Sequence, residues 1–141
     1  MRPIRSLVVV AATILALGIL APSVAAHSPK GFHLDKTCAP DSSAIGYHCT
    51  IQHADFKWFP LGTEVHYAAG PTPDVVYASI AIRNGRTNGV CVWSTDVNAV
   101  CTFLHGTGRL TQFHLRVVVT ANDDASIWYW DGAYWFGNPQ R

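Results

Sequence analysis

Hydrophobic and polar residues alternate along most of the chain beyond residue 46, and clusters of turn-forming residues separate the alternating runs. Alternation with a period of two gives a β-strand one apolar and one polar face. No helical period occurs after residue 26. The pattern therefore predicts an all-β domain of short strands. They are expected at Tyr47–Ala54, Thr63–Ala69, Asp74–Ile82, Val90–Ser94, Ala99–Leu104, Arg109–Thr120 and Ser126–Phe136.

Two of these runs carry further information. Gly106-Thr107-Gly108 precedes the run Arg109–Thr120 and predicts a tight reversal, because glycine adopts positive φ at no steric cost. Asp74–Ile82 is apolar on both faces. We therefore expect this strand to be covered by the domain interior on one side and by a partner subunit or a loop on the other.

Residues 102–119 read TFLHGTGRLTQFHLRVVV, and WYWDGAYWF follows at Trp128–Phe136. The order TF-x-x-GTGR-L-x-x-F-x-x-R-V-x-V and then W-x-WDGAYWF resembles the allene-oxide-cyclase-like barrel family, in particular its small secreted bacterial members, and more distantly the plant dirigent proteins. The resemblance covers roughly Cys49–Phe136. It implies an eight-stranded antiparallel β-barrel. It does not imply cyclase activity, because a fold does not fix a function.

Asp131-Gly132 interrupts the aromatic run Ser126–Phe136 and is compatible with a tight hairpin or with a β-bulge. Because the resemblance implies a single closing strand, we expect a bulge that lets this strand bend. Closure of the sheet into a barrel would remove exposed strand edges, which are a hazard for secreted all-β proteins.

The N-terminus has the features of a secretory signal peptide at residues 1–26. Arg2 and Arg5 precede the apolar run Leu7–Leu20, and the small residues Val24–Ala26 suit a cleavage site. The apolar run is shorter than the about 20 residues that a membrane span needs. We therefore expect a secreted, extracellular protein with no stable membrane anchor after cleavage. An uncleaved anchor helix is the alternative.

The mature chain is long enough for one domain and too short for two. Residues 27–46 are expected to form an irregular N-terminal arm, because Pro29, Gly31 and Pro40 interrupt any regular element. Residues 47–141 would then form the single barrel domain.

All four cysteines follow the signal peptide, and an even count in an exported protein predicts two disulfides. Of the three possible pairings we favour Cys38–Cys49 and Cys91–Cys101. Cys91 and Cys101 lie on two predicted strands around the polar turn Thr95–Asn98, so they can face each other across a hairpin. Zinc binding is the alternative, but the chain has no C-x-x-C spacing.

The balance of charges argues against a nucleic-acid partner. Without Arg2 and Arg5, eight of the ten basic residues remain against nine acidic residues, a net charge of −1. No basic stripe occurs that would bind phosphates. Gly106–Arg109 lacks the lysine and the strand-to-helix setting of a nucleotide loop. No serine lies in a G-x-S-x-G motif, so a nucleophilic hydrolase is not indicated either.

Polar side chains on two predicted strands are weak candidates for catalysis, namely Glu64, His66, His114 and Arg116. If they face the barrel interior, a histidine and a carboxylate can transfer a proton while Arg116 binds an anionic group. Such a site would suit a cofactor-free cyclase or isomerase, and we predict no cofactor. On the outer face the same residues would be solvated.

Five aromatic residues are candidates for ligand binding, namely Tyr67, Trp128, Trp130, Tyr134 and Trp135. They either pack as core and rim or form a surface for a sugar ring or an apolar ligand. An eight-stranded barrel can be filled by side chains or can hold one small ligand. The leading hypothesis is a non-enzymatic exported barrel that binds a small apolar or carbohydrate ligand, or a protein partner. An oligomer is compatible with the sequence.

His27 is a weak candidate for a metal ligand. Cleavage after Ala26 would expose its amine and imidazole as a bidentate chelate for copper, and a residue such as His33 would supply a third ligand. Copper binding is therefore the third functional hypothesis, after ligand binding and cyclase activity.

Overall fold

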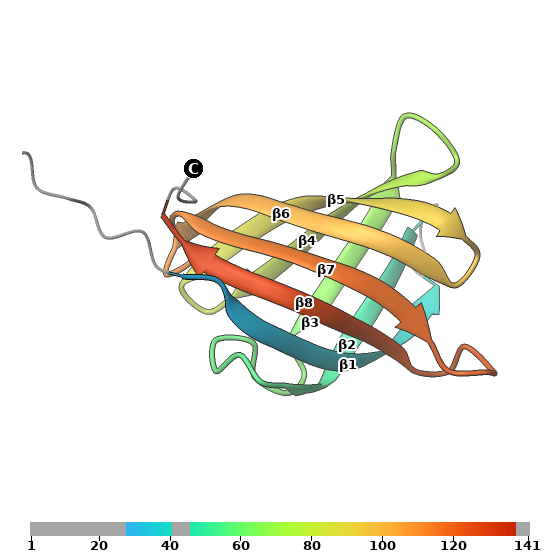
Figure 1. Cartoon of the computed structure of the whole chain (residues 1–141), viewed down its shortest axis with the longest axis horizontal. Helices are drawn as coiled ribbons and strands as arrows, with labels where there is room; N and C mark the ends of the chain where they lie inside the picture. Colours follow the sequence, from blue (N-terminus) through green and yellow to red (C-terminus); the bar gives the residue numbers. More distant parts are fainter. Residues whose placement is uncertain (1–27, 41–45, 138–141) are drawn as a thin grey trace, which may run out of the picture.

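The computed structural model describes residues 28–40 and 46–137, which form eight β-strands and no helix (Figure 1). The strands are β1 (Lys30–Pro40), β2 (Gly46–Ala54), β3 (Glu64–Ala69), β4 (Val75–Ile82), β5 (Gly85–Thr95), β6 (Asn98–Gly108), β7 (Phe113–Ala121) and β8 (Trp128–Phe136). Each strand is antiparallel to the next, and β8 pairs with β1, so the sheet closes. The predicted eight-stranded antiparallel barrel is confirmed. Residues 1–26, the predicted signal peptide, lie outside the described residues.

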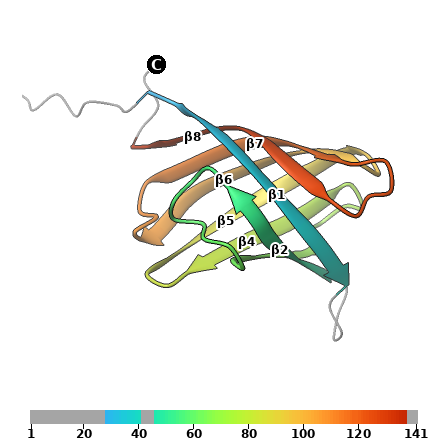
Figure 2. The ribbon, with the colours of Figure 1, turned by 90° about the horizontal axis from the view of Figure 1, so that it is seen from below.

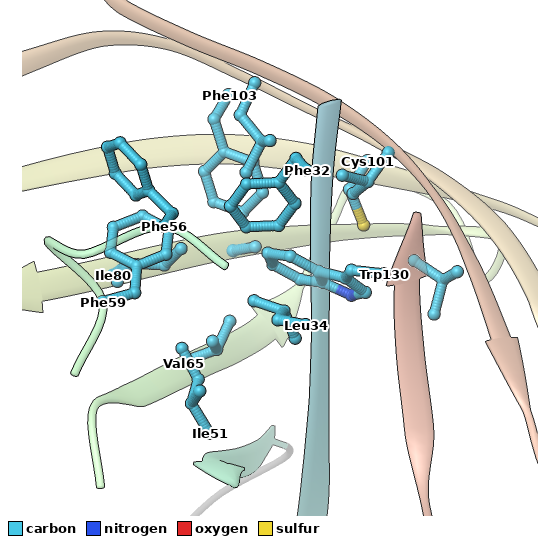
Figure 3. Close-up of a cluster of buried hydrophobic side chains, with 14 of the residues drawn as sticks. Phe32, Leu34, Ile51, Phe56, Phe59, Val65, Ile80, Cys101, Phe103 and Trp130 are labelled. Carbon is cyan, nitrogen blue, oxygen red and sulfur yellow. The ribbon is translucent and has the colours of Figure 1, made fainter. Parts of the chain in front are cut away.

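The strands are tilted, as sheet closure requires. β1 and β2 run obliquely across β4 and β5 (Figure 2). Side chains from all parts of the barrel wall converge on one apolar core (Figure 3). Its fully buried members include Leu34, Ile51, Val65, Ile80, Phe103, Leu115 and Trp130. In the part of the chain that the structure describes, no helix is long and apolar enough to cross a membrane.

β1 lies inside the segment that was predicted to be an irregular arm, and this prediction is wrong. The strand pairs with β2 on one side and with β8 on the other. Phe32, Leu34 and Lys36 are buried at alternate positions, so the period of a strand is present here too. Pro29 precedes the strand and Pro40 is its last residue, so neither proline interrupts the pairing.

The reversal between β6 and β7 lies close to where the glycines predict it, but its bounds differ. β6 continues through Gly108, and β7 begins at Phe113 rather than at Arg109. Gly108 has a φ of 57°, and a Cβ atom there would collide with the backbone oxygen of Asn84. Leu110 lies in the reversal and is fully buried. Of the residues between the strands, Leu110 therefore belongs to the core, whereas Arg109, Thr111 and Gln112 are exposed.

β8 is a single strand, as expected, but it has no bulge at Asp131-Gly132. Its register with β1 and with β7 is continuous through both residues. A Cβ atom at Gly132 would lie 2.8 Å from the Cα atom of Val117. The glycine thus permits a close approach of β7 rather than a bend. Register shifts occur elsewhere, between Asp35 and Lys36, between Arg86 and Asn88, and between Trp93 and Thr95.

Both predicted disulfides are present. Cys38 bonds to Cys49 and Cys91 bonds to Cys101. In each pair the two residues face each other on neighbouring antiparallel strands. The side chains of Cys49, Cys91 and Cys101 are buried, so the disulfides staple the barrel wall from the inside.

The outer face of β4 to β7 carries exposed apolar side chains. Tyr77 on β4 and Val118 on β7 are each 51% exposed. Their exposed neighbours across the strands are Val90, Val92 and Val100. The inner face of β4 is buried through Ala78 and Ile80, as its apolar run predicted. Cover of the outer face by a loop or a partner stays a prediction, because that face is exposed in the single chain.

Candidate functional site

The two ends of the barrel interior differ. At one end the loop between β2 and β3 inserts Phe56 and Phe59, whose ring centroids lie 5.3 and 5.8 Å from that of Phe113. The opposite end, near the Cys38–Cys49 disulfide, holds a cavity of about 800 Å³ that opens to solvent. We call it the open-end cavity. Its buried and half-buried lining consists of Lys36, Cys38, Cys49, Tyr67, Val76, Trp93 and Trp128.

Lys36 forms the floor of the open-end cavity. It points inward from β1, and only 2% of the residue is exposed. Its Nζ atom lies 5.3 Å from the ring centroids of Tyr67 and Trp130 and 5.7 Å from that of Trp128. It is also 3.7 Å from each sulfur of the Cys38–Cys49 disulfide. The amine is thus enclosed by three aromatic rings and a disulfide, which are weak partners for a charged group.

The surroundings of Lys36 favour its neutral form. Among the described residues, no carboxylate lies within ion-pair distance of Nζ. Asp74 and Asp96 line the same cavity but belong to its exposed rim. Burial therefore lowers the pKa of Lys36 from its usual 10.5 to about 7. Near neutral pH a large fraction of the molecules carries an uncharged amine at this position.

Tyr67 stays neutral beside this amine. Burial raises the pKa of its hydroxyl well above the usual 10. The ring N–H of Trp130 offsets a smaller part of this shift, without meeting the geometry of a full hydrogen bond. The phenol therefore cannot serve as an anionic partner for Lys36 over the physiological pH range.

Two tryptophans form the apolar wall of the cavity. Trp93 of β5 and Trp128 of β8 meet edge to face, with ring centroids 5.7 Å apart. Both side chains are half-buried, so part of each ring is accessible from the cavity. A second hollow, of about 640 Å³, adjoins the first and shares Tyr47 and Tyr67 with it. Four aromatic residues therefore contribute to the surface at this end of the barrel, namely Tyr47, Tyr67, Trp93 and Trp128.

The five candidate ligand-binding aromatics do not lie together. Tyr67 and Trp128 line the open-end cavity, and Trp130 is buried next to Lys36. Tyr134 belongs to the opposite end, where its ring centroid lies 4.6 Å from that of Phe56. Trp135 lies on the outer face of β8 and stacks on His114, with ring centroids 5.3 Å apart.

The candidate catalytic residues do not converge in the interior. Glu64 and His66 alternate with the inward Val65 and Tyr67, so they point outward from β3. The Nε2 atom of His66 lies 3.0 Å from Oε2 of Glu64, and both side chains are about half exposed. Arg116 is exposed on the outer face of β7, and His114 lies beneath Trp135 on that face. The structure therefore gives no support to a proton-transfer site built from these residues.

Of the two predicted copper ligands, the structure describes only His33. His27 lies outside the described residues. His33 is on the outer face of β1, and its Nδ1 atom lies 2.7 Å from a carboxylate oxygen of Asp131. No group of three or more histidine, cysteine, aspartate or glutamate side chains in the described ranges is arranged to hold a metal ion.

Lys36 and Trp93 are the residues of the cavity that sequence reasoning missed. Lys36 has the same phase as the inward Phe32 and Leu34, so a charged residue occupies an apolar position of an alternating strand. This is the signal that could have found it. It was hidden because residues 27–46 were interpreted as an irregular arm.

Comparisons with known proteins return no relative: no family model, no curated protein and no solved structure matches the chain. The resemblance of Cys49–Phe136 to allene-oxide-cyclase-like barrels therefore stays a prediction. We infer function from the open-end cavity itself.

Proposed function

We propose that this chain is an exported β-barrel that binds a small, largely apolar ligand with one polar group in the open-end cavity. One observation carries the proposal: Lys36, buried and without an ionic partner among the described residues, lies under a wall of aromatic rings. Burying an amine costs free energy that an apolar residue would not cost. A cavity of about 800 Å³ is also within the usual size range of small-molecule sites.

The lining favours an apolar ligand over a carbohydrate. A sugar needs several hydrogen-bonding side chains around it, whereas the buried and half-buried lining offers few polar groups, namely the Lys36 amine, the Tyr67 hydroxyl and the indole N–H groups of Trp93 and Trp128. The other polar side chains belong to the exposed rim, namely Tyr47, Asp74, Ser94, Thr95 and Asp96. We therefore expect the body of the ligand to pack against Trp93 and Trp128, with its polar group directed toward Lys36.

Export is part of the same proposal. The two disulfides are consistent with an extracellular protein, because such bonds persist in oxidising compartments. We propose that residues 1–26 are removed as a signal peptide and that the mature chain is secreted. Membership of the allene-oxide-cyclase-like family would account for the barrel. The candidate catalytic residues of this chain, however, do not face the barrel interior. Ligand binding is accordingly favoured over cyclase activity.

The test uses the fluorescence of anilinonaphthalenesulfonate, a probe with aromatic rings and one anionic group. We expect Lys36→Met and Trp93→Ala to weaken its binding at least about tenfold each, or about 1.4 kcal/mol. Trp58→Ala at the opposite end is the matched control and should leave the affinity unchanged. Circular dichroism checks that each variant is folded. Equal affinities for all folded variants would contradict binding in the open-end cavity.

A further inference from the structure

We propose that Lys36 captures small apolar aldehydes as imines at the floor of the open-end cavity. This inference rests on the proposed function, because it names the ligand class of the same site. A lysine can occupy an apolar interior as half of an ion pair or as a nucleophilic amine. No ionic partner of Lys36 is found among the described residues, so the first use does not account for it, and the second use is the one proposed here.

The geometry gives an aldehyde access to the amine. Lys36 is part of the cavity wall, and the cavity opens to solvent. The side chain comes from β1, which pairs with β2 and β8 and so fixes the position of the amine in the barrel. An apolar aldehyde that packs against Trp93 and Trp128 would direct its carbonyl carbon toward Nζ, because both rings line the cavity above the floor.

The protonation state of Lys36 suits nucleophilic attack. With a pKa of about 7, about half of the molecules carry the free amine at neutral pH. An ordinary lysine with a pKa of 10.5 has only roughly one free amine in three thousand at that pH. Within residues 28–40 and 46–137, the titratable groups that face the cavity from other elements are Tyr67, Tyr47, Asp74 and Asp96. Tyr67 is neutral and the other three are exposed, so none of them holds the amine protonated.

The chemical step balances without an oxidant, a reductant or a cofactor. The lone pair of Nζ attacks the carbonyl carbon, and one of the two protons of the neutral amine moves to the carbonyl oxygen, which gives a carbinolamine. The nitrogen then loses its second proton and the carbon loses the hydroxyl group, which leave together as water, so a C=N bond replaces the C=O bond. Water leaves through the open end, and hydrolysis reverses the reaction.

The aromatic rings around Nζ also suit the product. An unprotonated imine carries no charge at the position of the lysine nitrogen. The rings of Tyr67, Trp128 and Trp130 surround that position at 5.3 to 5.7 Å. The burial that favours the neutral amine favours the neutral imine in the same way. The cavity can therefore hold the adduct without a carboxylate counter-ion.

The experiment traps the imine by reduction. The full mature protein is incubated at neutral pH with a naphthaldehyde and cyanoborohydride, and peptide mass spectrometry locates the added naphthylmethyl group. We expect at least tenfold more label on Lys36 than on the exposed Lys57, and none at position 36 in Lys36→Arg. Mapping also separates Lys36 from the chain's α-amino group. Equal labelling of Lys36 and Lys57 would overturn the inference.

Two further probes separate this inference from the proposed function. The matching naphthylmethanol cannot form an imine, and its binding is followed by quenching of tryptophan fluorescence. If the alcohol binds but Lys36 is not labelled, imine capture is wrong and ligand binding stands. If neither probe interacts, both proposals fail. Naphthoate, the corresponding carboxylate, tests for an anionic ligand instead. If Lys36→Arg binds naphthoate more tightly than Lys36→Met does, and the native protein takes up no aldehyde label, then the ligand is a carboxylate and imine capture is wrong.

Discussion

The interior of this barrel is packed with aromatic rings at one end and hollow at the other. At the closed end Phe32, Phe56, Phe113 and Tyr134 contact one another, with ring centroids 4.6 to 6.3 Å apart. At the open end the rings line a cavity, and a lysine lies at its floor. Both ends use inward positions of the same alternating strands, so the fold itself does not determine which end is filled.

A single strand shows how the difference arises. Along β1 the inward residues are Phe32 in the closed end, Leu34 in the middle and Lys36 in the open-end cavity. Three successive inward residues of β1 therefore lead from the stabilising core to the candidate binding site. Burial of apolar side chains at the closed end stabilises the folded state, and burial of an amine at the open end destabilises it. This division of labour can be tested by perturbing each end separately.

The largest expected effect is at the closed end. Phe113→Ala removes a fully buried ring that contacts Phe56, Phe59, Tyr134 and Phe136. We expect the free energy of unfolding to fall by about 3–5 kcal/mol, because the substitution removes apolar contacts and leaves a cavity. Urea denaturation measures the change.

The control for this prediction lies on the same strand. Val118 is an outward, exposed residue of β7, and Val118→Ala should change the free energy of unfolding by less than about 0.5 kcal/mol. A loss for Phe113→Ala no larger than that for Val118→Ala would mean that the aromatic cluster does not stabilise the barrel.

The features that could be predicted from the sequence are local. Strand alternation, the reversal near Gly108 and the pairing of Cys91 with Cys101 depend on residues close together in the chain. β1 was missed because it is defined by pairing with β2 and with β8, and the second partner lies about a hundred residues away. Prolines at its two ends also hid the alternation of Phe32, Leu34 and Lys36.

The candidate site was harder to predict than the fold, for a different physical reason. Trp128 and Tyr134 have the same inward phase on β8, and both were candidates for ligand binding. The structure places Trp128 in the open-end cavity and Tyr134 in the closed end. Whether an inward aromatic lines a cavity depends on the loop between β2 and β3, which fills one end only. Strand periodicity carries no information on that loop.

The second prediction concerns the pH dependence of stability at the open end. In the unfolded chain Lys36 keeps its proton up to pH 10.5, whereas in the folded chain burial lowers its pKa to about 7. Between these values the unfolded state binds more protons, so the free energy of unfolding rises with pH, by up to about 1.4 kcal/mol per pH unit. Below the folded pKa this contribution is constant. Lys36→Met should remove the rise, measured by urea denaturation from about pH 7 to about pH 9.5.

Two features make this test specific. Tyr67 has a raised pKa and so acts in the opposite direction above its unfolded pKa of 10, which sets the upper limit of the window. Lys57→Met removes an exposed lysine and should keep the native pH dependence. If the free energy of unfolding depends on pH in the same way in Lys36→Met, in Lys57→Met and in the native chain, the amine of Lys36 is solvated and the floor of the cavity contains water.

The smallest effect compares one tryptophan from each end. Trp58 and Trp128 are both half-buried, but Trp58 contacts two rings, at 5.5 and 5.2 Å, whereas Trp128 contacts Trp93 alone among the ring pairs of the described residues, at 5.7 Å. We expect Trp58→Ala to lower the free energy of unfolding by about 1 kcal/mol more than Trp128→Ala, which is the contribution of one aromatic pair. Paired urea titrations resolve this difference in the free energy of unfolding. The affinity for anilinonaphthalenesulfonate should show the opposite order, with the larger loss of affinity in Trp128→Ala. If Trp128→Ala costs as much stability as Trp58→Ala and leaves probe binding intact, then the open end is packed as firmly as the closed end, and its rings serve the core rather than a ligand.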